Sequence, residues 1–317
     1  MRTYIIRRLI LLIPTFFLVT IIVFGVIRLI PGDIIDQMIA EHGRITQFSR
    51  AELEGILGLD TPIHVQYARW INGIFLHGDI GTSLWDRTPV IEDILVRLPV
   101  TIELCILSVI IALIIAFPIG IYSAIRQDTP GDYIGRSIAI LFISVPNFWI
   151  GTLIIVFPAL WWGWMPPIEY KPFFENQIQN LEMFILPAVT LGMLLCGVTM
   201  RMIRSMMLEV LRQDYIRTAW SKGLKERVVI TRHALKNAMI PVITLVGLQI
   251  VPLIGGAVII EQIFCLPGMG VYLLEGIFSR DYPVITGAVL FIAVIVLLIN
   301  LFIDLTYGFL DPRVQYK

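Results

Sequence analysis

The stretch CILSVIIALIIAFPIG, residues 105–120, decides the fold class of this chain. It is continuously apolar and lacks the alternation of polar and apolar residues that is typical of strands in a membrane barrel. A helix needs about 20 apolar residues to cross the roughly 30 Å hydrocarbon layer of a bilayer. Because the apolar run around this stretch covers residues 100–124, it predicts a membrane-spanning α-helix.

Similar runs recur along the chain. Of its 317 residues, 57% are hydrophobic and 15% are charged, which leaves too little polar surface to cover a soluble domain of this length. We therefore predict an all-α integral membrane protein with six transmembrane helices, at residues 9–30, 100–124, 134–161, 184–206, 242–260 and 284–306. The first run is long and no small-x-small cleavage site follows it, so we interpret it as a retained anchor.

Basic residues predict the orientation. With six spans both termini lie on one side, and Lys and Arg gather on the cytoplasmic side of membrane proteins. A cytoplasmic N-terminus places inside Arg2, Arg7, Arg8, Arg126, Arg136, Arg313, Lys317 and the dense cluster over residues 201–236. The short outer loops then carry only Lys171 and Arg280. We predict that the N and C termini are cytoplasmic.

The segment after the first span is predicted to be a folded extracytoplasmic region. Ser49 and Glu52 have the spacing of a capping box at a helix start. Ile63, Tyr67, Trp70 and Ile74 fall at helical spacing and predict an amphipathic helix that packs on its own protein or lies on the membrane surface.

Signals of catalysis or metal binding are missing from the sequence. There is no phosphate-binding loop and no HExxH motif, and the histidines are dispersed. Cys105, Cys196 and Cys265 are isolated, as small apolar residues often are. We expect a chain that is not an enzyme and that binds no cofactor and no metal.

An unusual polar passage, DYIRTAWSKGLKERVVITRHALKNAMIP, occupies residues 214–241. We predict a helix over 214–222, a break at Gly223, and a second helix over 225–239 before Pro241 opens the fifth span. The basic residues alone would suit a topology signal or a patch for anionic lipid. The helix–glycine–helix layout with apolar residues inside the charged run favours docking to a partner protein.

Part of this passage, TAWSKGLKERVVITRHALKN at residues 218–237, resembles the EAA loop of binding-protein-dependent ABC importer permeases. Ala219, Gly223 and Leu235 match that pattern, whereas four positions depart from it: Arg217, Thr218, His233 and Lys236. LGLDTPIHVQYARWI, GDIGTSL, LPVTIELCILS, SVPNFWIG, IFCLPGMG and LDPR resemble other stretches of the family in the same order. The overall pattern is similar to the B-type permease subunit of dipeptide/oligopeptide (peptide/nickel) importers.

The resemblance implies a type I ABC importer permease fold with an extracytoplasmic insertion after the first helix. Its parts would be residues 1–96 (first helix and extracytoplasmic region), 97–307 (permease core with a cytoplasmic coupling loop at 209–240) and 308–317 (cytoplasmic tail). The coupling joint would comprise Thr218, Ala219, Gly223 and Leu224, flanked by Lys222, Lys225, Glu226 and Arg227. A binding protein would dock on loops that contain Gly78, Asp79, Gly81, Pro267, Gly268 and Gly270.

The resemblance also implies the partners: a homologous second permease (the C-type subunit), two ABC ATPase subunits that use ATP and Mg, an extracytoplasmic substrate-binding protein and membrane lipid, but no nucleic acid. The protein would be located in the plasma (inner) membrane of a bacterium or an archaeon, as a multi-pass protein. Di- or oligopeptides are the cargo that the resemblance favours, while nickel chelates and glutathione remain open.

The leading alternative is a stand-alone secondary transporter or channel driven by an ion gradient. It predicts ion-coordinating acids near the membrane midplane, whereas Glu103, Glu261 and Asp304 lie near span ends. A signalling or assembly scaffold would also explain a docking loop.

Overall fold

The computed structural model describes residues 2–29, 55, 60–167 and 169–310. The predicted capping box at Ser49 and Glu52 and most of the predicted tail lie outside these residues. Among the described residues the secondary structure is helical, apart from an isolated bridge between Thr82 and Pro89. The all-α prediction is confirmed.

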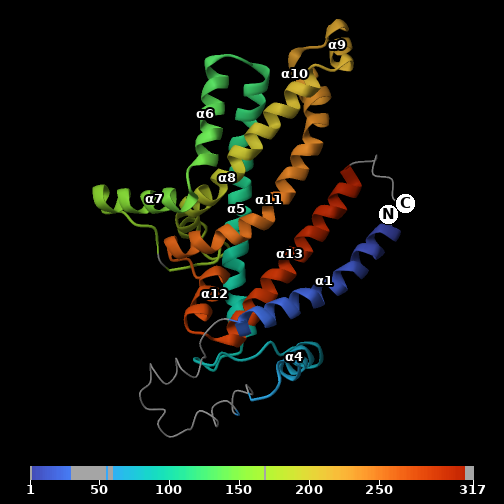
Figure 1. Ribbon diagram of the computed structural model, residues 1–317. Helices are drawn as coiled ribbons and strands as arrows, with labels where there is room; N and C mark the ends of the chain where they lie inside the picture. The colour runs from blue at the N-terminus through green and yellow to red at the C-terminus, as the bar shows by residue number, and fades with distance from the viewer. Residues whose placement is uncertain (1, 30–54, 56–59, 168, 311–317) are drawn as a thin grey trace. The chain divides into compact units, whose positions relative to one another are not determined.

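The described helices are named in chain order (Figure 1). They are α1 (Arg2–Leu29), α4 (Ile63–Asn72), η1 (Gly73–His77), α5 (Val90–Ile125), α6 (Pro130–Ser144), α7 (Asn147–Trp162), α8 (Gln177–Leu211), α9 (Asp214–Ser221), α10 (Glu226–Val228), η2 (Val229–Ala234), α11 (Leu235–Phe264), α12 (Met269–Phe278) and α13 (Tyr282–Leu310). Here η1 and η2 are π-helical.

Five membrane-spanning segments are long, apolar and continuous within the described part of the chain: α1, α5, α8, the run from α10 to α11, and α13. The predicted span over 134–161 is instead a pair of helices, α6 and α7, bent by 98°. Val145 is extended, with φ −89° and ψ 128°, because the ring of Pro146 disfavours helical backbone at the preceding residue. Counting this pair as one broken span gives six.

Contacts divide the chain into two compact units. The first unit comprises Met1–Val100 and Pro267–Leu298, and the second comprises Thr101–Leu266 and Ile299–Lys317. The chain passes between the units at residues 100–101, inside α5, and at residues 298–299, inside α13.

In the second unit α8 is the central helix, and it packs against α6, α7 and α11 (Figure 1). Glycines bring it close to its neighbours. A Cβ built on Gly192 would lie 2.7 Å from the Ser108 carbonyl oxygen of α5, and one on Gly197 would lie 2.7 Å from the Ala139 carbonyl oxygen of α6. Such close backbone approach is typical of helix packing in membranes, where small residues line the contact.

In the first unit α4 packs on α1. The Phe24 ring lies 5.5 Å from the Tyr67 ring and 5.6 Å from the Trp70 ring. The hydroxyls of Thr20 and Tyr67 are 2.9 Å apart and share a hydrogen bond. The amphipathic helix predicted from Ile63, Tyr67 and Trp70 is therefore confirmed, and its aromatic face contacts its own protein.

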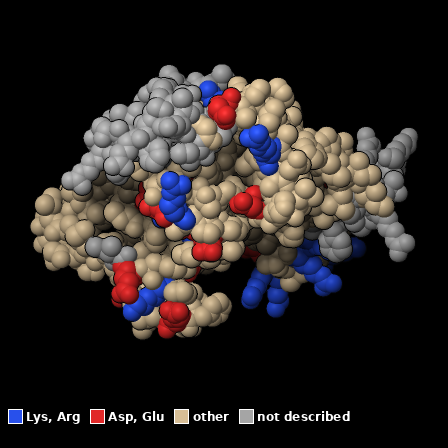
Figure 2. Space-filling view, turned by 90° about the horizontal axis from the view of Figure 1, so that it is seen from below, with Lys and Arg blue, Asp and Glu red and all other residues tan. Residues whose placement is uncertain are grey.

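Large apolar side chains are exposed on the long helices. Ile10 of α1, Ile114 of α5 and Phe302 of α13 are 59%, 66% and 70% exposed. Figure 2 shows a face on which uncharged atoms dominate the described surface and charged side chains stand singly or in small groups. Such a surface is stable when lipid covers it.

Candidate functional site

The chain turns after α9 at Gly223 and Leu224, and we call this turn the corner. It is built by a short-range hydrogen-bond motif. Gly223 has φ +74°, which glycine adopts without the strain that a Cβ brings. Its N–H donates to the Trp220 carbonyl at 2.9 Å, and the Leu224 N–H donates to the Ala219 carbonyl at 3.4 Å. This pair of bonds is the Schellman motif, which satisfies the last carbonyls of a helix and turns the chain. The predicted break at Gly223 is confirmed.

Apolar side chains anchor this corner from inside. Ile216 and Val229 are fully buried, and Ala219 is 6% exposed. They belong to one apolar cluster with Ile203 and Met207 of α8. The amphipathic pattern of α9 therefore fixes the corner to the second unit and leaves its polar side outward.

The outward side carries nearly all of the residues predicted for the coupling joint. Thr218, Gly223 and Leu224 are exposed, as are the flanking residues Lys222, Lys225, Glu226 and Arg227. Ala219 differs, because it is buried and contributes packing rather than contact surface. The sequence did not single out Trp220, which is 44% exposed beside Leu224 at 37%, although both are apolar. Exposed apolar residues within a charged rim are typical of protein-docking surfaces.

The helix after the corner is longer than predicted. From Glu226 it continues through α10, the π-helical η2 and α11, so Pro241 lies inside a helix rather than opening a new one. Neighbouring helices and local π-helical adjustments allow a proline inside a membrane helix. The corner is therefore joined to the following span without a loop.

The loop residues predicted to dock a binding protein fall into two groups within the first unit. Gly78 and Asp79 are exposed, and Gly78 ends η1 with φ +65°. Gly268 and Gly270 are buried at the start of α12. The remaining two, Gly81 and Pro267, are partly buried. The exposed members are the ones that a partner can contact.

A buried carboxylate, Asp281, joins the loop at residues 83–84 to the start of α13, and no local sequence pattern predicted it. Asp281 is 2% exposed, and its Oδ2 accepts bonds from the Ser83 hydroxyl at 2.7 Å and the Leu84 N–H at 2.9 Å. The Trp85 indole N–H donates to the Ser279 carbonyl at 2.8 Å. Burial raises the pKa of Asp281 above its ordinary value, although the hydrogen bonds that Asp281 accepts from Ser83 and Leu84 act in the opposite direction.

Two of the acids considered for ion coupling, Glu261 and Glu103, accept hydrogen bonds from neighbouring side chains. Glu261 is fully buried and accepts a hydrogen bond from the Thr101 hydroxyl at 2.5 Å. Glu103 accepts one from the Tyr170 hydroxyl at 3.4 Å. Burial and the Glu103 carboxylate raise the pKa of Tyr170, which keeps this phenol in its donor form.

Comparison with known proteins extends over the whole chain. The chain is 38% identical over 340 residues to the dipeptide transport system permease protein DppB of Escherichia coli K12, and 41% identical over 336 residues to DppB of Alkalihalophilus pseudofirmus. It is 39% identical over 316 residues to a putative peptide transport system permease protein of Brucella abortus. Each match covers 100% of both chains.

Solved structures share the fold at low sequence identity. The MetNI methionine ABC transporter in an inward-facing conformation matches with a TM-score of 0.56 and 14% identity, over 69% of this chain and 96% of that chain. An amino acid ABC transporter with histidines matches with a TM-score of 0.55 and 13% identity, over 68% and 94%. The chain therefore has the all-α fold of ABC importer permeases.

Two family descriptions cover nearly the full length. Residues 116–316 match the binding-protein-dependent transport system inner membrane component, and residues 1–105 match the N-terminal part of such membrane components. The chain therefore belongs to the family of binding-protein-dependent transport system inner membrane components, and it is a multi-pass permease of the inner membrane.

Proposed function

We propose that this chain forms half of the translocation path of an ATP-driven importer and that an ATPase subunit holds the exposed corner around Gly223. The observation that carries the proposal is the construction of that corner. Its inner side is fixed by buried Ile216 and Val229, while its outer side offers Trp220 and Leu224 within a charged rim. A surface that is rigid from within and apolar at its centre suits transmission of force from a partner.

Family membership supports our proposal for the remaining partners. A second, homologous permease completes the path, and two ATPase subunits bind ATP and Mg, so this chain needs no cofactor of its own. An extracytoplasmic binding protein delivers the cargo to the outer loops near Gly78 and Asp79. The Lys and Arg side chains within the segment 201–236 keep the corner on the cytoplasmic side of the membrane.

The cargo that we propose is a di- or oligopeptide. Support comes from the relatives, which are named as dipeptide or peptide transport permeases. Uptake of a radiolabelled dipeptide by cells that lack their own peptide importers and express the complete complex tests this. Uptake that requires this chain supports peptide cargo, and a complex that is assembled and hydrolyses ATP but gives no dipeptide uptake at all contradicts it.

Docking of the ATPase is tested by co-purification from membranes. Leu224→Glu places a charge at the centre of the exposed corner, and we expect it to lower the amount of ATPase retained by the chain. Phe278→Glu is the matched control, since Phe278 is 76% exposed on α12, outside the corner. Equal retention by both variants would contradict the assignment.

A further inference from the structure

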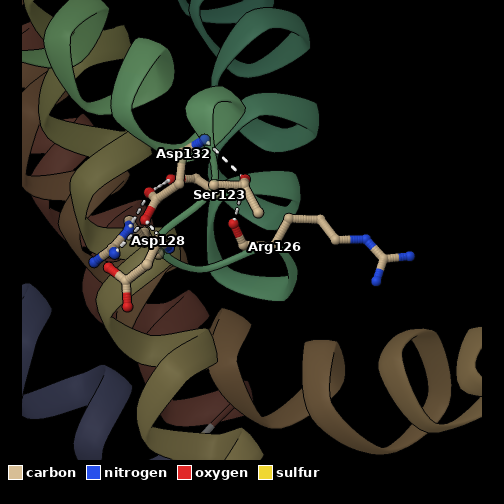
Figure 3. A network of polar contacts seen from close by, with 6 residues as sticks. Ser123, Arg126, Asp128 and Asp132 are labelled. Atoms are coloured by element: carbon tan, nitrogen blue, oxygen red, sulfur yellow. Dashed lines mark hydrogen bonds and ion pairs between the residues drawn. The ribbon is translucent and has the colours of Figure 1, made fainter.

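An ion pair with a buried carboxylate joins α6 to α8, and the same carboxylate is hydrogen-bonded to α5 (Figure 3). Asp132, in the first turn of α6, has no exposed surface. Its Oδ1 and Oδ2 accept bonds from Nε and Nη2 of Arg204 on α8, each at 2.8 Å. Oδ1 also accepts a bond from the Ser123 hydroxyl on α5, and Oδ2 accepts one from the Asp128 N–H at 3.0 Å. One carboxylate thus holds three helices at a single point.

The geometry of this contact is directional. Two parallel bonds between a guanidinium and a carboxylate fix both the distance and the relative angle of the groups, which a lysine ammonium does not do. The carboxylate also lies at the N-terminal end of α6, where the helix dipole favours negative charge. The turn before it is ordered as well, since the Thr129 hydroxyl donates to the Arg126 carbonyl at 2.6 Å. The pair therefore restrains the α5–α6 turn against α8.

Close helix contacts make the same three helices a stiff group. A Cβ on Gly120 of α5 would lie 2.9 Å from the Ile203 Cβ and 3.1 Å from the Met200 carbonyl oxygen of α8. On the α6 side, a Cβ built on Gly197 would lie 2.7 Å from the Ala139 carbonyl oxygen. Closely packed helices have low compressibility, so a displacement of one helix is transmitted to the others.

The coupling corner rests on this group in two ways. Buried Ile216 and Val229 share an apolar cluster with Ile203 and Met207 of α8. On the surface, Arg126 in the α5–α6 turn lies 3.8 Å from Glu226 of α10, with side chains 56% and 49% exposed. An ion pair so exposed contributes little by itself. The buried cluster is the firm connection, and the surface pair adds a second point of contact.

We propose that the Asp132–Arg204 pair makes the α5–α6 turn and α8 one transmitting body, so that a displacement of the corner moves α6 as well as α8. The proposal rests on the proposed function of the corner as the ATPase-docking joint. Asp132 and Arg204 act here as positioning residues. Without the two parallel hydrogen bonds between Arg204 and Asp132, α8 would move with the corner while α6 could keep its position.

The test measures whether α6 follows the corner in the assembled complex. Spin labels at Ser137→Cys on α6 and Ser221→Cys on α9, both exposed positions, report their separation in lipid nanodiscs. The native cysteines are replaced by alanine. Distances are recorded by pulsed electron paramagnetic resonance without nucleotide and after trapping with ATP and vanadate. The wild-type chain is expected to show the same narrow distance distribution in both states.

Variants of the pair are compared with a matched control. Asp132→Asn is expected to make the distribution broad and different between the two states, and to lower the stimulation of ATP hydrolysis by the binding protein about tenfold. The double variant Asp132→Arg with Arg204→Asp is expected to restore part of the narrow distance distribution and part of the stimulation of ATP hydrolysis. Arg201→Gln, at an exposed position one turn earlier on α8, is expected to behave as wild type. A role in stability alone would lower the yield of complex and leave the distance distribution unchanged.

The outcomes separate this inference from the proposed function. A narrow, unchanged distribution in assembled Asp132→Asn would overturn the inference, whether or not the binding protein still stimulates ATP hydrolysis. If Asp132→Asn does not assemble, Arg204→Lys decides by the same distance, because it keeps the charge and loses the two parallel hydrogen bonds. A wild-type complex that lacks any ATPase partner would instead contradict the proposed function.

Discussion

At the scale of single residues, Gly223 is selected for its backbone and not for space. A Cβ at this position would meet nothing within 4 Å, yet φ is +74°. The cost of a side chain is therefore conformational, about 1 to 2 kcal/mol for an ordinary L-residue in the left-handed region. Asparagine pays less than alanine, because its side chain bonds locally in that conformation.

Gly223→Ala is accordingly expected to destabilise the corner by about 1 kcal/mol, and Gly223→Asn by less. Hydrogen exchange of the amides at the end of α9 measures this directly, since the Gly223 and Leu224 N–H groups donate the closing bonds. If alanine and asparagine gave identical exchange rates, the left-handed conformation would not be what the position requires.

Asp281 predicts a pH dependence of the outer loops. Burial raises the pKa of this carboxyl in the folded state. Its contribution to stability is therefore fully present below the ordinary carboxyl pKa and is lost as the pH rises through the raised value. After correction for intrinsic exchange, protection of the Leu84 amide should fall over that pH range in the wild type. Asp281→Asn removes the titration, so the same fall in this variant would contradict the assignment.

At the scale of elements, α9 has separate anchoring and contact residues. Ile216→Ala removes a fully buried side chain and is expected to cost about 2 to 5 kcal/mol, although relaxation around the site can lower this. Trp220→Ala, at a 44% exposed position, should leave thermal stability nearly unchanged and reduce retention of the ATPase. Thermal unfolding and co-purification of both variants check this division. A reversal of the two effects would show that α9 is oriented differently.

What the sequence could predict depends on how local each interaction is. The corner at Gly223 was predicted because a Schellman motif uses consecutive residues. The single span predicted over residues 134–161 missed the break of 98° between α6 and α7, since hydropathy records the length of an apolar run and not the path of the backbone. The Asp132–Arg204 and Ser83–Asp281 contacts join residues 72 and 198 positions apart, so only the folded chain reveals them.

At the scale of the whole molecule, membership of the family identifies the chain as a permease of a binding-protein-dependent system. The alternative of a stand-alone ion-driven transporter is wrong for this chain, and the buried contacts of Glu261 and Thr101 agree with a structural role for that acid. We propose that the corner at Gly223 couples ATP hydrolysis to the movement of this permease.

The most direct measurement is ATPase activity of the co-expressed complex in lipid nanodiscs, with and without its binding protein. Gly223→Pro removes the N–H that closes the corner and forbids its positive φ. Gly163→Ala is the control, because Gly163 also has a left-handed φ, +63°, at the end of α7. We predict that the binding protein stimulates the wild type and the control but not Gly223→Pro. Stimulation that persists in a folded Gly223→Pro complex would contradict the account.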